Sequence, residues 1–152
     1  MGRSRDHVSQ DNARLAREVY EAFNEGDFER ILEHVSEDLE VLNVAFAQTS
    51  RGPEGLRQFY GGWRTMAPHD GHVEVRAQLA SEEGVTNENI YRGTHTGPLA
   101  SPMGEIAATG HSFELPFVEV WRIREGKIAS IHGYIDSGTI MQQLGVGPPT
   151  EA

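Results

Sequence analysis

Residues 113–135 read FELPFVEVWRIREGKIASIHGYI, and their pattern sets the architecture expected for the whole chain. Residues 113–123 and 127–135 each alternate between large apolar side chains and polar or small ones. This is the period of a β-strand with one buried face. Between them stand residues 124–126, where a glycine in the third position is typical of a three-residue hairpin loop. The stretch therefore predicts a β-hairpin.

The length of this loop decides which side chains share a face of the hairpin. A three-residue loop pairs Ile123 with Lys127 and turns Glu119 toward the apolar face. A two-residue loop would instead bring His132 and Tyr134 to the face of Glu119. The glycine that ends the loop favours the three-residue form.

Glu119 is the anomaly on the apolar face, because its neighbours there are Phe117, Trp121 and Ile131. Apolar surroundings disfavour the charged carboxylate and raise its pKa. A carboxyl group that titrates nearer to neutrality suits general acid–base catalysis. The alternative is that Glu119 lies near the mouth of the fold, where it is hydrated or paired with an arginine.

Helices are expected before this hairpin. Apolar residues three and four apart predict two short helices on either side of Gly26, capped by Asp11 or Asn12 and by Asp27. Pro53 suits the first turn of a third helix. The apolar face of this third helix carries Leu56, Phe59, Tyr60 and Trp63.

Strands and one long loop account for most of the rest. Residues 39–44, 73–79 and 85–96 alternate as strands do, whereas residues 97–110 are rich in Gly, Pro and Ala and predict a loop. A short last helix follows and ends at Leu144, with Asp136 or Ser137 as its cap. Helices followed by an antiparallel sheet give an α+β fold.

Length and composition restrict the function. The 152 residues form one domain over 11–145, and the flanking residues 1–10 and 146–152 look flexible. A net charge of −10 opposes binding to nucleic acid or to an anionic membrane. The chain has no cysteine, so it can form neither a disulfide nor a thiolate site. Without a membrane span or a signal peptide, we expect a soluble, cytoplasmic protein.

Four motifs in order resemble the SnoaL-like polyketide cyclases of the NTF2-like superfamily. They are GTHTGPL at 93–99, ATG at 108–110, WRIREGKI at 121–128, and Asp136 with QLG at 143–145. The resemblance implies a cone-shaped α+β barrel, in which a curved, mostly antiparallel sheet wraps on about three N-terminal helices around a hydrophobic cavity. It also implies a homodimer without metal or cofactor. Family cyclases close rings by intramolecular aldol chemistry, with a side chain that moves a proton beside a carbonyl.

The resemblance also assigns site residues. The catalytic Asp of the cyclases falls at Gly133, so their principal acid–base group is missing here. Their pocket His falls at Glu119, their pocket Asn matches Asn43, and His111 stands where an Arg is common. The catalytic candidates are therefore Glu119, Asn43 and His111.

Five further residues are candidates for substrate binding. Trp63, Phe117 and Trp121 would form a cavity wall with Tyr60, although such aromatic residues more often belong to a core. His95 precedes the Gly-Pro loop and would line the cavity mouth; a hydrogen bond to loop backbone would serve equally well.

Three classes of function remain open. The first is a cofactor-independent cyclase, isomerase or lyase that moves a proton on an apolar carbonyl compound, polyketide-like or polycyclic. The second is an epoxide hydrolase in the same barrel, which would need a further carboxylate or Arg beside Glu119. The third is a non-catalytic module for ligand binding or dimerisation.

No metal site is expected, because the His69 and His72 turn has no third ligand nearby. A homodimer is expected through the outer face of the hairpin, whose apolar side chains would otherwise be exposed. That face carries, on the three-residue loop, Val118, Val120, Ile128, His132 and Tyr134.

Overall fold

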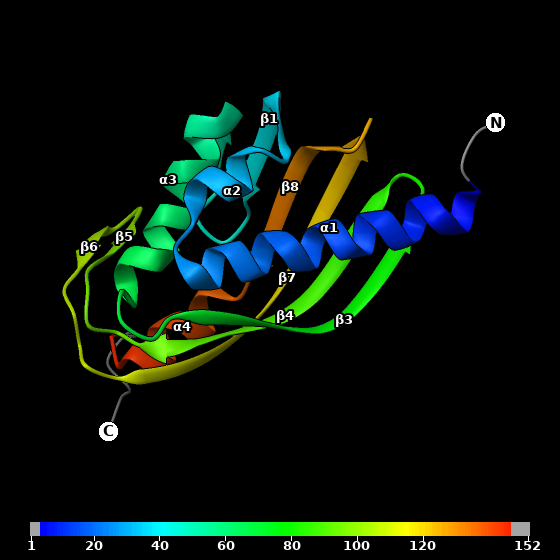
Figure 1. Ribbon diagram of the computed structural model, residues 1–152. Coiled ribbons are helices and arrows are strands. Elements are labelled where there is room, and N and C mark those ends of the chain that lie inside the picture. The colour runs from blue at the N-terminus through cyan, green and yellow to red at the C-terminus, as the bar shows by residue number, and fades with distance from the viewer. Residues whose placement is uncertain (1–3, 147–152) are drawn as a thin grey trace.

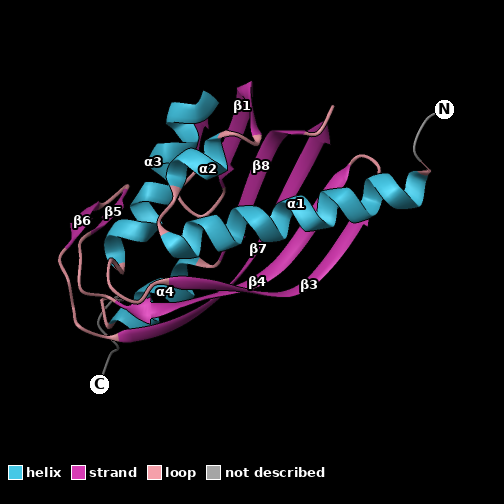
Figure 2. Ribbon diagram, viewed as in Figure 1, coloured by secondary structure: helices cyan, strands magenta, loops and turns pink. Residues whose placement is uncertain are grey.

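A computed structural model describes residues 4–146 as a curved six-stranded sheet with helices over one face (Figure 1). The elements are α1 (Arg5–Glu25), α2 (Phe28–Leu32), β1 (Val35–Asn43), β2 (Gln48–Arg51), α3 (Gly52–Met66), β3 (His72–Ser81), β4 (Gly84–Thr94), β5 (Leu99–Ser101), β6 (Gly104–Ile106), β7 (Ser112–Arg124), β8 (Lys127–Ile135) and α4 (Ser137–Leu144). Figure 2 shows α1, α2 and α3 on the same side of the sheet. The α+β class is confirmed.

The sheet is open, which corrects the expectation of a barrel. Its strand order is β2-β1-β8-β7-β4-β3, and every neighbouring pair is antiparallel except β1 with β8. A closed barrel would require its two edge strands to pair with each other, whereas β2 and β3 pair only with β1 and β4. Helices α1 and α3 cover the concave side instead, and the core lies between them and the sheet.

The turn between β7 and β8 has two residues, so the predicted three-residue loop is wrong. Arg124, and not Ile123, pairs with Lys127. The two turn residues, Glu125 and Gly126, have φ angles of 51° and 76°. Two central residues with positive φ are typical of the type I′ turn, whose twist matches that of the flanking strands.

A β-bulge cancels the effect of the shorter turn on the facing of the side chains. The pairing shifts by one residue between Arg122 and Ile123 and leaves Ala129 as the extra residue on β8. An extra residue reverses the facing of everything beyond it. Glu119 therefore faces the concave side, as expected, but through a bulge that the sequence pattern did not indicate. Its partner across the strands is Gly133, and not Ile131 as the three-residue loop predicts.

The N-terminal helix starts earlier than expected. Helix α1 begins at Arg5, and Ser4 caps it by accepting a hydrogen bond from a backbone N–H of the first turn. The predicted cap at Asp11 or Asn12 is therefore wrong, and residues 5–10, expected to be flexible, are helical. Of the predicted flexible ends, residues 1–3 and 147–152 lie outside the described residues.

Other predicted boundaries agree with the structure. Asp27 caps α2, and α3 has Pro53 in its first turn. The predicted loop at 97–110 contains the small β5–β6 hairpin. No helix within residues 4–146 is both long and apolar enough to cross a membrane.

The outer face of the β7–β8 hairpin differs from the expected one at Ile128. The bulge turns this side chain inward, where it is completely buried. Val118, Val120 and His132 are half-buried, and Tyr134 is exposed. Four of the five expected side chains thus remain on the outer face, and the homodimer stays a prediction.

Light scattering at micromolar concentration should give twice the 16.8 kDa mass of the chain. A Val120→Glu variant should give the monomer mass, because a carboxylate would be buried without a partner in the interface. A monomer mass for the unaltered protein would rule out this dimer.

The last helix depends on its cap. One oxygen of the Asp136 carboxylate accepts a hydrogen bond from the Gly138 backbone N–H at 3.0 Å, and the other accepts one from the Thr139 hydroxyl at 2.9 Å. These bonds lower the pKa of Asp136. The candidate cap is confirmed.

Replacing Asp136 with Ala should lower the melting temperature by a few degrees, because the first turn of α4 loses its acceptors. Asp136→Asn keeps one acceptor oxygen, so its melting temperature should lie between those of wild type and Asp136→Ala. Thermal unfolding followed by circular dichroism measures both, and an unchanged melting temperature in Asp136→Ala would contradict the capping role.

Candidate functional site

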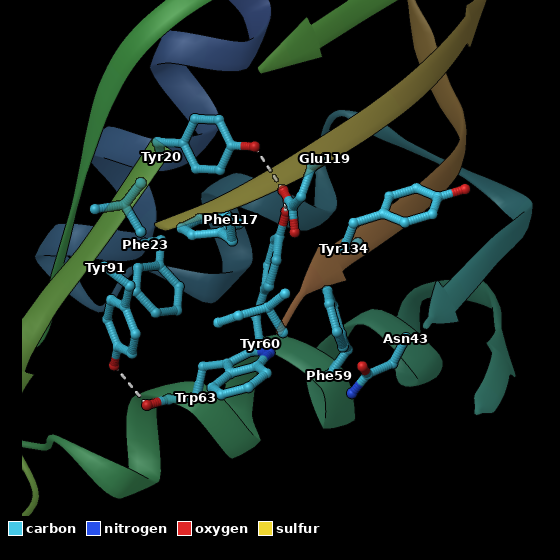
Figure 3. A pocket seen from close by; sticks show the side chains of 13 residues that line it. Tyr20, Phe23, Asn43, Phe59, Tyr60, Trp63, Tyr91, Phe117, Glu119 and Tyr134 are labelled. Atoms are coloured by element: carbon cyan, nitrogen blue, oxygen red, sulfur yellow. Dashed lines mark hydrogen bonds between the residues drawn. The ribbon is translucent and has the colours of Figure 1, made fainter. Parts of the chain in front are cut away.

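An apolar cavity lies between the concave face of the sheet and helices α1 and α3 (Figure 3). Its volume is about 40 Å³, with room for about two or three water molecules. The helices contribute Tyr20, Phe23, Phe59, Tyr60 and Trp63. The sheet contributes Asn43, Val73, Tyr91, Phe117, Glu119, Gly133 and Ile135, and Tyr134, whose side chain is exposed, also borders the cavity. We call this space the inner cavity.

Glu119 carries the only charged group in the lining, and its side chain is almost completely buried. Its Oε1 accepts three hydrogen bonds: from the Tyr20 hydroxyl at 2.5 Å, the Tyr60 hydroxyl at 2.9 Å and the Trp121 indole N–H at 3.2 Å. These donors come from α1, α3 and β7. One oxygen of the carboxyl group is therefore held in place by three different elements.

Burial raises the pKa of Glu119, and the three hydrogen bonds act in the opposite direction without cancelling that effect. The pKa values of Tyr20 and Tyr60 are raised well above their ordinary value, first by burial and then by the nearby Glu119 charge. Both hydroxyls consequently stay protonated and act as donors to the carboxyl group.

The second oxygen of Glu119 has different surroundings. Within residues 4–146, no hydrogen bond reaches Oε2. This oxygen lies over Gly133, where an added Cβ would be 3.8 Å from it. Oε2 is therefore the atom of the carboxyl group that remains available to a ligand.

Asn43 lies on the same row across the sheet as Glu119. Gly133 pairs with Glu119 on one side and with Asn43 on the other. Two strand spacings put the Cα atoms of Glu119 and Asn43 about 10 Å apart. Asn43 is 7% exposed, and no side-chain hydrogen bond to it occurs within residues 4–146. Its amide faces the cavity without a protein partner.

Phe59 fills part of the space between these two polar groups. Because Gly133 has no side chain, the Phe59 ring approaches the strand, and its Cζ would be 3.1 Å from a Cβ at that position. Figure 3 shows Phe59 between Asn43 and Glu119. A ligand that touches both polar groups therefore has to displace this ring.

Five of the eight predicted site residues line the inner cavity. They are Glu119, Asn43, Tyr60, Trp63 and Phe117. Trp121 lies behind Glu119, where its ring packs against Tyr20 at a centroid distance of 5.4 Å. Its contact with the site is the hydrogen bond to the carboxyl group.

The two predicted histidines are not in this lining. His111 is exposed, and its ring lies beside Gly145 at the end of α4. His95 is completely buried, and its Nδ1 is 2.9 Å from the Thr109 hydroxyl and accepts from the Thr109 backbone N–H at 3.2 Å. Burial lowers the pKa of His95. His95 therefore holds the loop through a hydrogen bond to its backbone, as the alternative hypothesis predicts. His111 lies eight residues along the chain from Glu119, and an extended strand of that length keeps the two side chains apart.

Sequence reasoning missed Tyr20, which donates the shortest hydrogen bond to Glu119. A signal was present, since Tyr20 lies one turn from Ala16 and from Phe23 on the apolar stripe of α1. A buried tyrosine hydroxyl needs a partner. Glu119, the one carboxyl group in the apolar row of β7, is the acceptor that this hydroxyl finds.

No group of three or more His, Asp or Glu side chains is close enough to hold a metal ion in the part of the chain that the structure describes. The expected independence from metal ions and cofactors stays a prediction.

Solved structures with the same fold come from several bacteria. A protein described as a SnoaL-like polyketide cyclase from Jannaschia sp. CCS1 is 16% identical, with a TM-score of 0.82 over 97% of this chain and 100% of that one. A protein described as a polyketide cyclase from Xanthomonas campestris pv. campestris is 20% identical, with a TM-score of 0.72 over 90% and 98%.

A third structure, from Catenulispora acidiphila, is described as having a ketosteroid isomerase-like fold and was determined in complex with trimethylamine. It is 19% identical, with a TM-score of 0.71 over 88% of this chain and 93% of that one. A sequence search of curated proteins finds no significant match. The family model of the SnoaL-like polyketide cyclases matches residues 13–144, and the chain belongs to that family.

Proposed function

We propose that this protein is a cofactor-independent enzyme of the cyclase or isomerase type, in which Glu119 moves a proton on an apolar carbonyl compound. The observation that carries the proposal is the Glu119 carboxyl group, buried in an apolar cavity with Oε1 held by three donors and Oε2 free of them. Family membership supports the same class of chemistry.

The direction of each proton transfer follows from this arrangement. Oε2 of ionised Glu119 would take a proton from the carbon beside a carbonyl, and the electron pair of that C–H bond would move to form an enolate. The Asn43 amide would donate a hydrogen bond to the enolate oxygen. The enolate carbon would then attack a second carbonyl in the same molecule, and Glu119 would return its proton to the new alkoxide. In an isomerisation, the proton would return to a different carbon.

The environment of Glu119 suits a group that must both accept and release a proton. Burial alone would favour the neutral acid, and the donors from Tyr20, Tyr60 and Trp121 stabilise the carboxylate. A catalytic pKa near the working pH makes both steps possible. The lining contains no Lys, Arg or His to pair with an anion, and its aromatic rings suit an apolar substrate.

Epoxide opening is less well supported. It was expected to need another carboxylate or an Arg beside Glu119, and the inner cavity presents neither. The non-catalytic alternative predicts that a ligand binds without any chemical change. The proton-exchange experiment with 2-tetralone tests this alternative.

The raised pKa of Glu119 predicts how the stability of the protein depends on pH. A carboxyl group whose pKa is raised in the folded state binds more protons there than in the unfolded chain, so stability falls as pH rises above about 4.5. Glu119→Gln removes this loss and keeps an oxygen that accepts from the three donors. The stability of Glu119→Gln relative to wild type should therefore increase with pH.

Urea unfolding at several pH values from about 4.5 upward measures this difference. Glu114→Gln is the matched control, because Glu114 lies exposed on the same strand. Parallel pH curves for wild type and Glu119→Gln would show that Glu119 titrates normally and would contradict the raised pKa.

The second prediction concerns activity. The protein should accelerate exchange of the protons beside the carbonyl of 2-tetralone in D₂O, followed by proton NMR. Glu119→Gln should lower this rate by about 10²-fold or more, because it cannot accept the proton. Glu114→Gln should exchange as wild type does. Absence of acceleration by wild type, although 2-tetralone binds, would favour the non-catalytic alternative.

A further inference from the structure

A second and larger space lies next to the inner cavity. It has a volume of about 360 Å³ and is bounded by β1, the edge strand β2, helix α3 and strand β5. We call it the outer cavity. The two spaces share Asn43, Phe59 and Trp63, which form the partition between them.

The sizes of the two spaces imply that a substrate extends across this partition. About 40 Å³ holds only a few atoms around a reacting carbonyl. Small-molecule sites usually have volumes of about 300–1,000 Å³, a range that the outer cavity reaches. A ring-bearing substrate that reaches Glu119 would have the rest of its structure in the outer cavity.

The partition can open through Phe59. This side chain is only half-buried, and its ring is held by packing alone, with Tyr60 at a centroid distance of 5.3 Å. Rotation of the ring out of the space over Gly133 would join the two cavities. Trp63, which stacks on Phe46 at 6.2 Å, would remain as an aromatic wall beside the opening.

The outer cavity differs from the inner one in chemistry. Its polar side chains are all uncharged: Asn43, Gln48, Thr49, Ser50 and Gln58. Lys, Arg, His, Asp and Glu are absent from its lining. Amides and hydroxyls both donate and accept hydrogen bonds, so they match a group that does the same, such as an alcohol, better than an ion.

Most of these polar groups lack protein partners. Ser50 donates to the Gly55 carbonyl at 3.2 Å, whereas the exposed side chains of Gln48, Thr49 and Gln58 make no side-chain hydrogen bond within residues 4–146. The Asn43 amide, more than nine-tenths buried, is likewise unpartnered at the boundary of the two spaces. An amide in such a position is available to water or to a ligand for hydrogen bonding.

We propose that the outer cavity is a substrate subsite for an uncharged, hydroxyl-bearing chain attached to the apolar carbonyl portion that reacts at Glu119. This assignment rests on the proposed function for the role of the inner cavity. It names a substrate class that is amphiphilic: apolar at the reacting end, and hydroxylated at the other.

Two probes of equal length test the proposal: 6-(2-hydroxyethoxy)-2-tetralone and 6-propoxy-2-tetralone, which differ only in a terminal hydroxyl or methyl group. Their dissociation constants are measured by calorimetry in Glu119→Gln, so that binding is read without turnover. The hydroxyl probe should bind at least as tightly as the propyl probe, although water solvates it better.

Gln48→Leu combined with Gln58→Leu should shift the ratio of the two dissociation constants about tenfold toward the propyl probe, because two exposed amides are removed. Gln142→Leu, an exposed change on α4 outside both cavities, is the matched control and should leave the ratio unchanged. Unfolding curves verify that each variant is folded.

A tighter propyl probe in Glu119→Gln, or a ratio unaffected by the two glutamine changes, would overturn the subsite. These results do not depend on catalysis. A shifted ratio without proton exchange in the wild-type protein would instead retain the subsite and reject the proposed reaction.

Discussion

The convergence of three donors on one oxygen of Glu119 is the interaction on which the rest of the structure depends. Tyr20 comes from α1, Tyr60 from α3 and Trp121 from β7, so the carboxyl group joins both covering helices to the middle of the sheet. A buried carboxyl group with no cation beside it is costly, and this cost is acceptable only when its hydrogen bonds are made. The geometry that satisfies Oε1 leaves Oε2 over the cavity.

The absence of a side chain at Gly133 belongs to the same arrangement. A Cβ there would lie 3.1 Å from the Phe59 ring and 3.8 Å from Glu119 Oε2. The family resemblance places the catalytic Asp of the cyclases at this position. A second carboxyl group so close to Glu119 would make it hard for both to ionise. Gly133 and Glu119 are therefore compatible neighbours: β8 has no side chain at this position, and the carboxyl group stands on β7 instead.

The inner and outer cavities present different surfaces, one largely aromatic and one with several neutral polar side chains. Aromatic rings surround the Glu119 carboxyl group, and its burial among them raises its pKa. Neutral amides and hydroxyls line the larger space beyond Phe59.

The sequence by itself determined the α+β class, the β7–β8 hairpin, the apolar face of α3 and the caps at Asp27 and Asp136, because each depends on local periodicity or on one turn of backbone. It also singled out Glu119, since a carboxyl group in an apolar row stands out. Only the tertiary structure decided the bulge at Ala129, the open sheet edge, the partnership of Tyr20 with Glu119 and the distance of His111 from the cavity. These features depend on how elements distant in sequence meet, and neither the period of a strand nor that of a helix carries that information.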